Sequence, residues 1–141
     1  MVEDIRFTKE HEWIILKEGG ELAVIGISDF AQRQLGDIVS IELPKVGSRF
    51  RQMQAIAIID SVKASSDIYC ALTGEVMEIN EELLEHPEWI NQSPYELGWI
   101  VKVKPSDIEE FNNLMTKEQY DKFIGEIEKE KDDDEKIESR R

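Results

Sequence analysis

Cysteine and histidine are scarce in this 141-residue chain, which contains one cysteine and two histidines. The lone Cys70 cannot form an internal disulfide or a multi-cysteine metal site, and its apolar surroundings favour a small buried residue. His11 and His86 are far apart, and neither has a metal-ligand partner at a standard spacing. The sequence also lacks a glycine-rich phosphate loop, a nucleophile elbow and a cysteine–histidine pairing. We therefore expect neither a catalytic constellation nor a metal site, and no enzymatic activity of the chain itself.

Long apolar segments are also missing. No run approaches the roughly 20 residues that a bilayer-spanning helix needs. The first six residues contain acids and no apolar stretch, unlike a secretory signal, and they lack the Arg- and Ser-rich character of a transit peptide. We expect a cytoplasmic protein without a membrane partner. The length and apolar content suit one domain with a single core.

Positive charge is in deficit, and the net charge is -14. The segment from Glu128 to Arg141 holds seven acids and five bases, so most of the excess lies on the body of the chain. An acidic body repels phosphate backbones, which makes nucleic acid a poor partner. The charge either favours basic protein surfaces as partners or serves solubility alone.

The apolar residues follow strand periods over most of the chain. Val39, Ile41 and Leu43 alternate with polar residues, which is the period of a half-buried strand. Two apolar runs on either side of residues 17–20, which include two glycines, indicate a hairpin. Strands are predicted at residues 13–16, 21–25, 37–43, 55–59, 68–72, 74–79 and 99–103. The expected fold class is mainly β with short helices.

Two short helices are indicated between the strands. Ser28 is a good N-cap for a helix over residues 29–35, and Gly36 is placed to end it. Asn80 is predicted to cap a second short helix that contains Leu83 and Leu84.

The period becomes helical after Pro105. Apolar residues within 108–115 fit one helical face, and Thr116 with Gln119 forms a capping-box pattern. A C-terminal helix that packs on the sheets follows, and we expect the charged segment 128–141 to be frayed or disordered. The carrier domain is thus assigned to residues 1–127. The apolar face of the helix consists of Tyr120, Phe123, Ile124 and Ile127.

A weak internal repeat is present. Residues 36–41 and 74–79 share the pattern glycine, acid, apolar, apolar, polar, isoleucine. Two strands related by a pseudo-two-fold axis would produce it. Glycine–acid openings of strands are common, so the pattern alone does not decide the architecture.

Lys63 lies between two strand-like runs, in a stretch where small and polar residues replace the apolar ones. A hairpin tip is implied, with Val62 and Ala64 beside the lysine. A lysine presented there is accessible to an acylating enzyme. From the spacing alone, an ordinary solvated lysine is the better interpretation.

Five segments of the chain resemble the glycine cleavage system H-protein family, in the same order and over roughly residues 7–124. They are Thr8-Lys9-Glu10-His11-Glu12-Trp13, Gly26-Ile27-Ser28-Asp29-Phe30-Ala31, Leu35-Gly36-Asp37-Ile38-Val39 with Glu42-Leu43-Pro44, Asp60-Ser61-Val62-Lys63-Ala64-Ser65-Ser66-Asp67-Ile68-Tyr69 with Gly74-Glu75-Val76, and Asn91-Gln92-Ser93-Pro94-Tyr95 with Gly98-Trp99.

The resemblance implies a barrel-sandwich hybrid, a hammerhead-like lipoyl domain with a C-terminal helix. It also implies lipoate in amide linkage on Lys63, attached by a lipoate-attaching enzyme. Such a carrier takes an aminomethyl group from glycine decarboxylase, a pyridoxal-phosphate enzyme. It passes the group to a tetrahydrofolate-dependent aminomethyltransferase, and dihydrolipoamide dehydrogenase then reoxidises the arm. The carrier makes no bond itself, and we expect a monomer in isolation.

The resemblance also suggests roles for other residues. Glu12 and Asp67 match acids that receive the aminomethyl nitrogen in a cleft, where a carboxylate would accept a charge-assisted hydrogen bond. The alternatives are an acid at an exposed strand edge for Glu12 and a turn residue for Asp67. His11 is grouped with the cleft, although a structural role and a partner contact both stay open. Asp60 and Gly74 match positions that the lipoylating enzyme recognises.

The chain departs from the family pattern in places. Asp60 replaces the usual glutamate, Cys70 begins a segment that lacks the usual proline, and the charged extension has no counterpart. A second hypothesis therefore keeps the arm but has it carry sulfur in a pathway built on heterodisulfide-reductase-like enzymes. A third, of another class, is an unmodified or biotinyl binding module. Biotin carriers usually have methionine where Val62 precedes the lysine, which argues against it.

Overall fold

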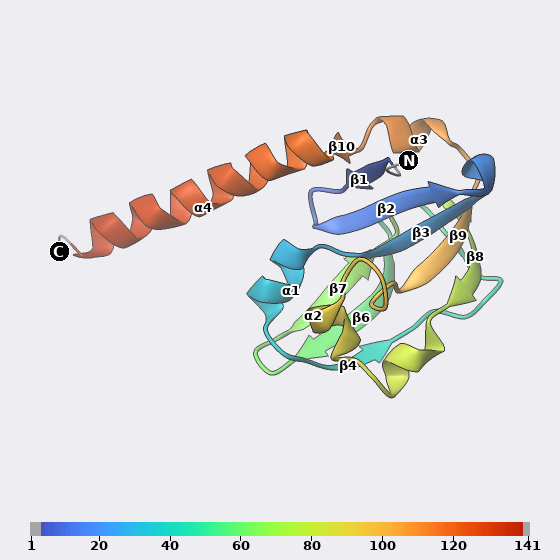
Figure 1. Ribbon diagram of the computed structural model, residues 1–141, viewed down its shortest axis with the longest axis horizontal. Coiled ribbons are helices and arrows are strands. Elements are labelled where there is room, and N and C mark those ends of the chain that lie inside the picture. Colours follow the sequence, from blue (N-terminus) through green and yellow to red (C-terminus); the bar gives the residue numbers. More distant parts are fainter. Residues whose placement is uncertain (1–3, 140–141) are drawn as a thin grey trace.

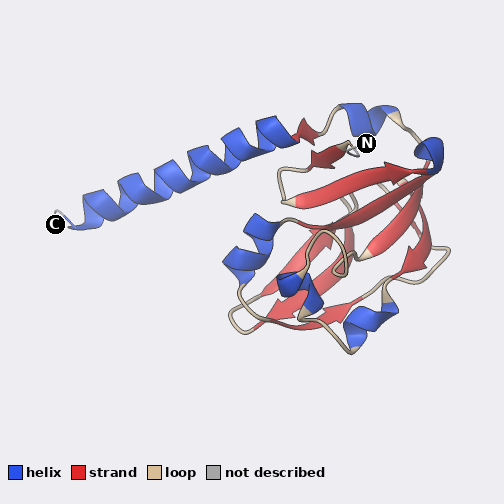
Figure 2. Ribbon diagram, viewed as in Figure 1, coloured by secondary structure: helices blue, strands red, loops and turns tan. Residues whose placement is uncertain are grey.

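The computed structural model describes the backbone of residues 4–139 and the side chains of residues 4–132. Ten strands form two antiparallel sheets, which Figures 1 and 2 show packed face to face. The strands are β1 (Ile5–Phe7), β2 (Glu12–Lys17), β3 (Leu22–Ile27), β4 (Ile38–Glu42), β5 (Arg49–Phe50), β6 (Ala55–Ser61), β7 (Ser65–Tyr69), β8 (Gly74–Ile79), β9 (Val101–Pro105) and β10 (Met115–Thr116). The helices are α1 (Asp29–Leu35), α2 (Trp89–Gln92), α3 (Glu109–Asn112) and α4 (Lys117–Ser139), with 3-10 turns at Glu18–Gly20 and Glu81–Leu84.

The larger sheet has the strand order β10-β1-β2-β3-β9-β8-β5, and the smaller has the order β4-β6-β7. Side chains alternate across β2, so Ile14 enters the core between the sheets while Trp13 points to the opposite face. The main core contains residues from both sheets, including Ile25, Ile59 and Val101 at 0% exposure. The predicted mainly β class with two antiparallel sheets is confirmed.

Most predicted strands have bounds that differ by a few residues from those observed, and two of these differences have a clear structural reason or effect. The expected strand 68–72 ends at Tyr69, because the next residue leaves the ladder and exchanges backbone hydrogen bonds with Met53 and Gln54. Residues 70–72 are fully buried, so their apolar character reports burial in the core and not strand pairing. The last long strand begins at Val101, two residues later than predicted.

The short helix α1 matches the prediction to the residue. The Ser28 hydroxyl accepts a hydrogen bond from the Ala31 amide, and Gly36 ends the helix with φ +77°. The predicted short helix with Leu83 and Leu84 is present as the 3-10 turn Glu81–Leu84, and Asn80 occupies its N-cap position, but its side chain does not cap it. The side-chain amide of Asn80 donates instead to the carbonyls of Leu97 and Trp99, 2.9 and 2.8 Å away. Its short polar side chain ties the chain before β9 in place of capping a helix.

The first turns of helix α4 attach it to the large sheet. The capping box is confirmed, with Thr116 N–H bonded to Gln119 and Gln119 N–H bonded to the Thr116 hydroxyl. Tyr120 stacks on Phe7 of β1 at 4.1 Å between ring centroids, within a second cluster on the outer face of the large sheet. The single face expected over 108–115 is split instead between α3 and β10.

The helix crosses the expected domain boundary at residue 127 without a break. It runs to Ser139, and Figure 1 shows its C-terminal end projecting beyond the sheets. The segment 128–139 is therefore helical, which differs from the frayed tail expected from its charge. Residues 140–141 lie outside the described part, and the domain boundary itself stays a prediction.

The two repeated segments occupy β4 and β8, one in each sheet. Both strands carry an irregularity at the same repeat position, after Ile38 in one and after Val76 in the other. The extra residues, Val39 and Met77, are both exposed. A shared bulge is a more specific correspondence than the six-residue pattern, and it supports a duplicated strand.

Candidate functional site

Lys63 lies at the tip of the β6–β7 hairpin, where Asp60 pairs with Ser65 as the last rung. The Ser61 hydroxyl accepts from the amides of Lys63 and Ala64, at 3.2 and 3.1 Å. The Ser61 amide also donates to the Ala64 carbonyl at 2.8 Å. These hydrogen bonds close the tip. They are made within the stretch where the sequence replaces apolar residues by small and polar ones.

The hairpin is tied to the neighbouring segment before β4. The Val62 amide donates to the Asp37 carbonyl at 3.0 Å. The Lys63 stem passes over Gly36, and a Cβ placed on that glycine would lie 3.3 Å from Lys63 Cε. Among residues with described side chains, 4–132, the Lys63 ammonium has no hydrogen-bond or ion-pair partner. The amine is therefore presented free, with its stem resting on a residue that offers no side chain to obstruct it.

A cleft of about 350 Å³ lies beside this position. One wall is α1, which ends at Leu35, the neighbour of Gly36, and the opposite wall is the end of β7. The lining is mixed: about half of the residues are apolar or aromatic, and the others are two acids, one lysine, one histidine, one glutamine and one serine. The lining residues are Glu10, His11, Ile27, Phe30, Ala31, Gln34, Leu35, Ser66, Asp67, Ile68, Tyr69, Ile127 and Lys131.

Asp67 and Glu10 are the two acids of the cleft. Asp67 is exposed on β7, four residues from Lys63, and it lines the cleft, while its role toward an aminomethyl group stays a prediction. Glu10 was not singled out from the sequence, although it belongs to the first quoted motif and precedes His11 directly. Together they place two carboxylates in the lining of the cleft.

Glu12 is buried at 1% exposure, so the alternative of an acid at an exposed strand edge is contradicted. Its carboxylate accepts from the Thr8 hydroxyl and from the Tyr69 amide at 3.2 Å. Burial raises its pKa to about 7, although both hydrogen bonds act in the other direction. Glu12 thus lies beneath the cleft wall and joins β2 to the end of β7.

His11 connects the cleft to α4. It has φ +75°, and its Nδ1 is 2.8 Å from the Tyr120 hydroxyl, which in turn is 2.7 Å from Ser28 Oγ. Burial lowers the pKa of His11, so the neutral ring is favoured. Of its two open interpretations, the structural one is the one that these contacts support.

The two predicted recognition residues are in different sheets. Asp60 stands one rung from the tip and accepts from the Ser40 hydroxyl at 3.2 Å. Gly74 opens β8, where a Cβ would clash with the carbonyl oxygen of Lys104. The structure explains this glycine by strand packing, and its role in recognition stays a prediction.

Cys70 is fully buried, as expected. Its thiol donates to the Leu72 carbonyl, and burial raises its pKa to about 11. A thiol in this state is a poor nucleophile.

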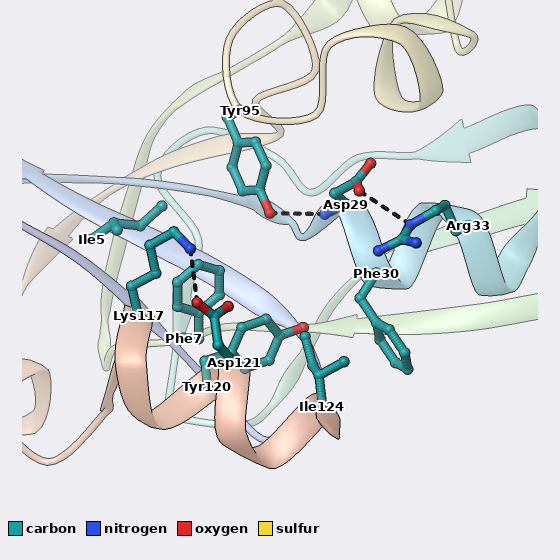
Figure 3. Close-up of a pocket in the computed structure, with 10 residues that line it drawn as sticks. All are labelled: Ile5, Phe7, Asp29, Phe30, Arg33, Tyr95, Lys117, Tyr120, Asp121 and Ile124. Atoms are coloured by element: carbon teal, nitrogen blue, oxygen red, sulfur yellow. Dashed lines mark hydrogen bonds and ion pairs between the residues drawn. The ribbon is translucent and has the colours of Figure 1, made fainter. Parts of the chain in front are cut away.

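A second cavity, of about 430 Å³, lies on the other side of Phe30 (Figure 3). Its charged groups pair with one another, Lys117 with Asp121 at 2.9 Å and Arg33 with Asp29 at 3.1 Å. The Tyr95 hydroxyl accepts from the Asp29 amide. These pairs satisfy the groups that a ligand would need, so the smaller cleft beside Lys63 is the stronger candidate.

Comparisons of the sequence and of the fold with known proteins identify the family. The sequence profile named glycine cleavage H-protein matches residues 5–127. The chain belongs to this family. It is 49% identical over 126 residues to the glycine cleavage system H protein of Halothermothrix orenii, covering 89% of this chain and 97% of that protein. It is 46% identical to the namesake from Geobacillus kaustophilus, covering 87% and 95%.

A solved structure has the same fold. The crystal structure of a glycine cleavage system H protein from Mycobacterium marinum superposes with a TM-score of 0.79 at 29% identity, covering 89% of this chain and 99% of that one. The family is one of lipoyl carrier subunits. In the described part of the H-protein chain, no helix is both long and apolar enough to cross a membrane.

Proposed function

We propose that this H protein carries lipoate on Lys63 and shuttles the aminomethyl group of glycine. The load would come from glycine decarboxylase and go to the tetrahydrofolate-dependent aminomethyltransferase. Electrons would then pass to dihydrolipoamide dehydrogenase. The observation that carries the proposal is the free amine of Lys63 at a closed hairpin tip, with its stem over Gly36, which directly follows the cleft-lining Leu35.

The residues present fit a lipoyl group. An amide on the lysine nitrogen needs an accessible amine, and the flexible stem can reach several partners in turn at high effective concentration. The attached group would supply a disulfide that takes up a one-carbon fragment and electrons. Every other requirement falls on the protein, which must present the arm and shelter it.

The cleft suits the loaded arm. Its apolar lining residues match an aliphatic chain, and burying that chain excludes water from the load. Asp67 and Glu10 would accept hydrogen bonds from the aminomethyl nitrogen, which is cationic when protonated. Glu12 supports this arrangement from below by holding the Tyr69 amide.

The remaining roles are part of the same proposal. Asp60 and Gly74 would guide the lipoate-attaching enzyme, and the partners would carry out all bond-making steps, so that the chain is a non-catalytic carrier. We also propose a cytoplasmic protein that is monomeric in isolation. The sulfur-carrier alternative was motivated by the departures around Cys70. The buried, hydrogen-bonded thiol gives it no support.

The test is to lipoylate the purified protein, incubate it with glycine and the glycine decarboxylase of its host, and record intact mass with peptide mapping. A lipoyl adduct on Lys63 that gains an aminomethyl group is the expected result. An adduct that stays unloaded, while another H protein loads in parallel, would remove the glycine cleavage role. Absence of any adduct on Lys63 would remove the carrier proposal.

A further inference from the structure

Helix α4 contributes two residues to the cleft, and they come from the middle of the helix. Ile127 and Lys131 are one helical turn apart, so they lie on the same face and both line the cavity. The helix is positioned for this by Tyr120, which stacks on Phe7 and bonds to His11. Because these contacts fix the rotation of the helix at Tyr120, they also determine which side chains of the later turns face the cleft.

Lys131 bridges the two helices that flank the cleft. Its Nζ donates to Gln34 Oε1 at 2.7 Å, across 97 positions of sequence. Gln34 is on the last turn of α1, two residues before the glycine over which the Lys63 stem passes. The bridge therefore joins two cleft-lining residues at the end of α1 that adjoins Gly36.

The family profile ends at residue 127, four residues before Lys131. Gln34 lies inside the matched range, but its partner does not. This part of α4 is thus an addition to the matched carrier domain, and it is placed where it affects the cleft. Its other charged neighbours in the cleft are Glu10 and Asp67, both of which line the same cavity.

We propose that Lys131 is a positioning residue that straps α4 across the cleft through Gln34 and retains the loaded arm there. The inference rests on the proposed carrier function and adds to it a residue that protects the load from water; we call this the guard. Retention matters because water can cleave the carbon–sulfur bond of an aminomethyl thioether. That reaction consumes one water and yields the thiol, formaldehyde and ammonium.

The first experiment measures spontaneous loss of the load. Lipoylated wild type and Lys131→Met are loaded with glycine and decarboxylase, separated from the enzyme, and followed by intact mass and released formaldehyde. Methionine keeps length and helix propensity while removing the donor. We expect about threefold faster loss in Lys131→Met, because one charge-assisted hydrogen bond is removed at an open edge.

Matched variants make the test specific. Lys129→Met removes the same charge from the same helix but at a residue that does not line the cleft, and it should behave as wild type. Gln34→Ala should match Lys131→Met, whereas Gln34→Glu retains an acceptor for Lys131 and should restore slow loss. The initial loading rate of Lys129→Met should equal that of wild type, which separates retention from general damage to the helix.

A second readout needs no lipoate. Hydrogen–deuterium exchange of the unmodified protein should show faster exchange of residues 127–132 in Lys131→Met than in Lys129→Met. If wild type never loads, the carrier function fails, while this difference would still support the strap. Equal rates of loss in all variants would overturn the guard. Slower loss in Lys131→Met would also overturn it, because the lysine would then act by repelling the cationic load.

Discussion

The hairpin tip holds Lys63 with bonds within residues 61–64 and one bond to Asp37, whereas the cleft beside it is assembled from four segments that span more than 120 positions. The tip depends on the Ser61 hydroxyl and a few backbone bonds. The cleft needs residues 10–11, α1, the end of β7 and α4 to meet. Attachment of a group should therefore be robust to changes elsewhere in the fold. Sheltering that group should be sensitive to them.

The largest effect is expected at the tip itself. Lys63→Arg should abolish lipoylation completely, because a guanidinium does not form the amide, while the unfolding free energy stays within about 0.5 kcal/mol of wild type. Intact mass after incubation with a lipoate-attaching enzyme checks the first point and urea denaturation the second. Lys45→Arg, in another exposed turn, is the control and should be fully modified. Modification of Lys63→Arg would place the acceptor elsewhere.

Gly74→Ala tests whether this glycine is needed for recognition of the hairpin by the lipoylating enzyme or for packing of the sheet. Its Cβ would meet the Lys104 backbone, so we expect a loss of about 3 kcal/mol in unfolding free energy, measured by urea denaturation. Gly125→Ala is the control. It has open space in a helix, and the change should be neutral or stabilising by up to about 1 kcal/mol. A stable Gly74→Ala protein that is lipoylated slowly would instead assign this residue to recognition.

Glu12 connects β2 to the cleft wall, and its titration should be visible in stability. Its folded pKa of about 7 exceeds the ordinary value of 4.5, so the folded state binds the proton more tightly. The stabilisation is present below about pH 4.5 and is lost as the pH rises to about 7, by up to roughly 3 kcal/mol.

Denaturation series from pH 5 to 8 on wild type and Glu12→Gln check this. The variant should lack that component of the pH dependence, since glutamine does not titrate. Parallel pH profiles for the two proteins would contradict this prediction. They would show that Glu12 is ionised throughout this pH range and that burial does not raise its pKa.

Tyr120→Phe should loosen the cleft and leave the tip intact. Removing the hydroxyl leaves His11 and Ser28 without their shared partner, a loss of about 1–2 kcal/mol in unfolding free energy. Exchange of α4 amides should quicken, while the rate of lipoylation at Lys63 should not change. A slower lipoylation rate in this variant would break the proposed independence of the two regions.

The smallest effect is expected for Asp67→Asn. The neutral amide keeps the shape but weakens the hydrogen bond to a cationic load, so the aminomethyl group should be lost about threefold faster. Lys9→Met is the control, because Lys9 neighbours Glu10 in the first motif but does not line the cleft. No change in Asp67→Asn together with faster loss in Glu10→Gln would assign the nitrogen contact to Glu10.

Local patterns in the sequence predicted several elements well. Helix α1 has its cap, its length and its terminating glycine within nine consecutive residues, and the structure agrees at each. The Thr116 capping box and the burial of Cys70 were predicted equally well. Short strands such as β5 and β10 were missed, because two residues carry no readable period.

The sequence by itself therefore determined the mainly β class, the presented lysine and the motifs of the family, because these depend on neighbours along the chain. Only the tertiary structure decided which residues share the cleft. It shows that Glu12 is buried and that the Asn80 side chain bonds to the segment before β9 and does not cap a helix. It also shows that Lys131, in a charged segment, bonds to Gln34. A charged residue in a polar segment has no period that reveals its partner, and the position of α4 follows from the packing of Tyr120 on a strand more than 100 residues earlier.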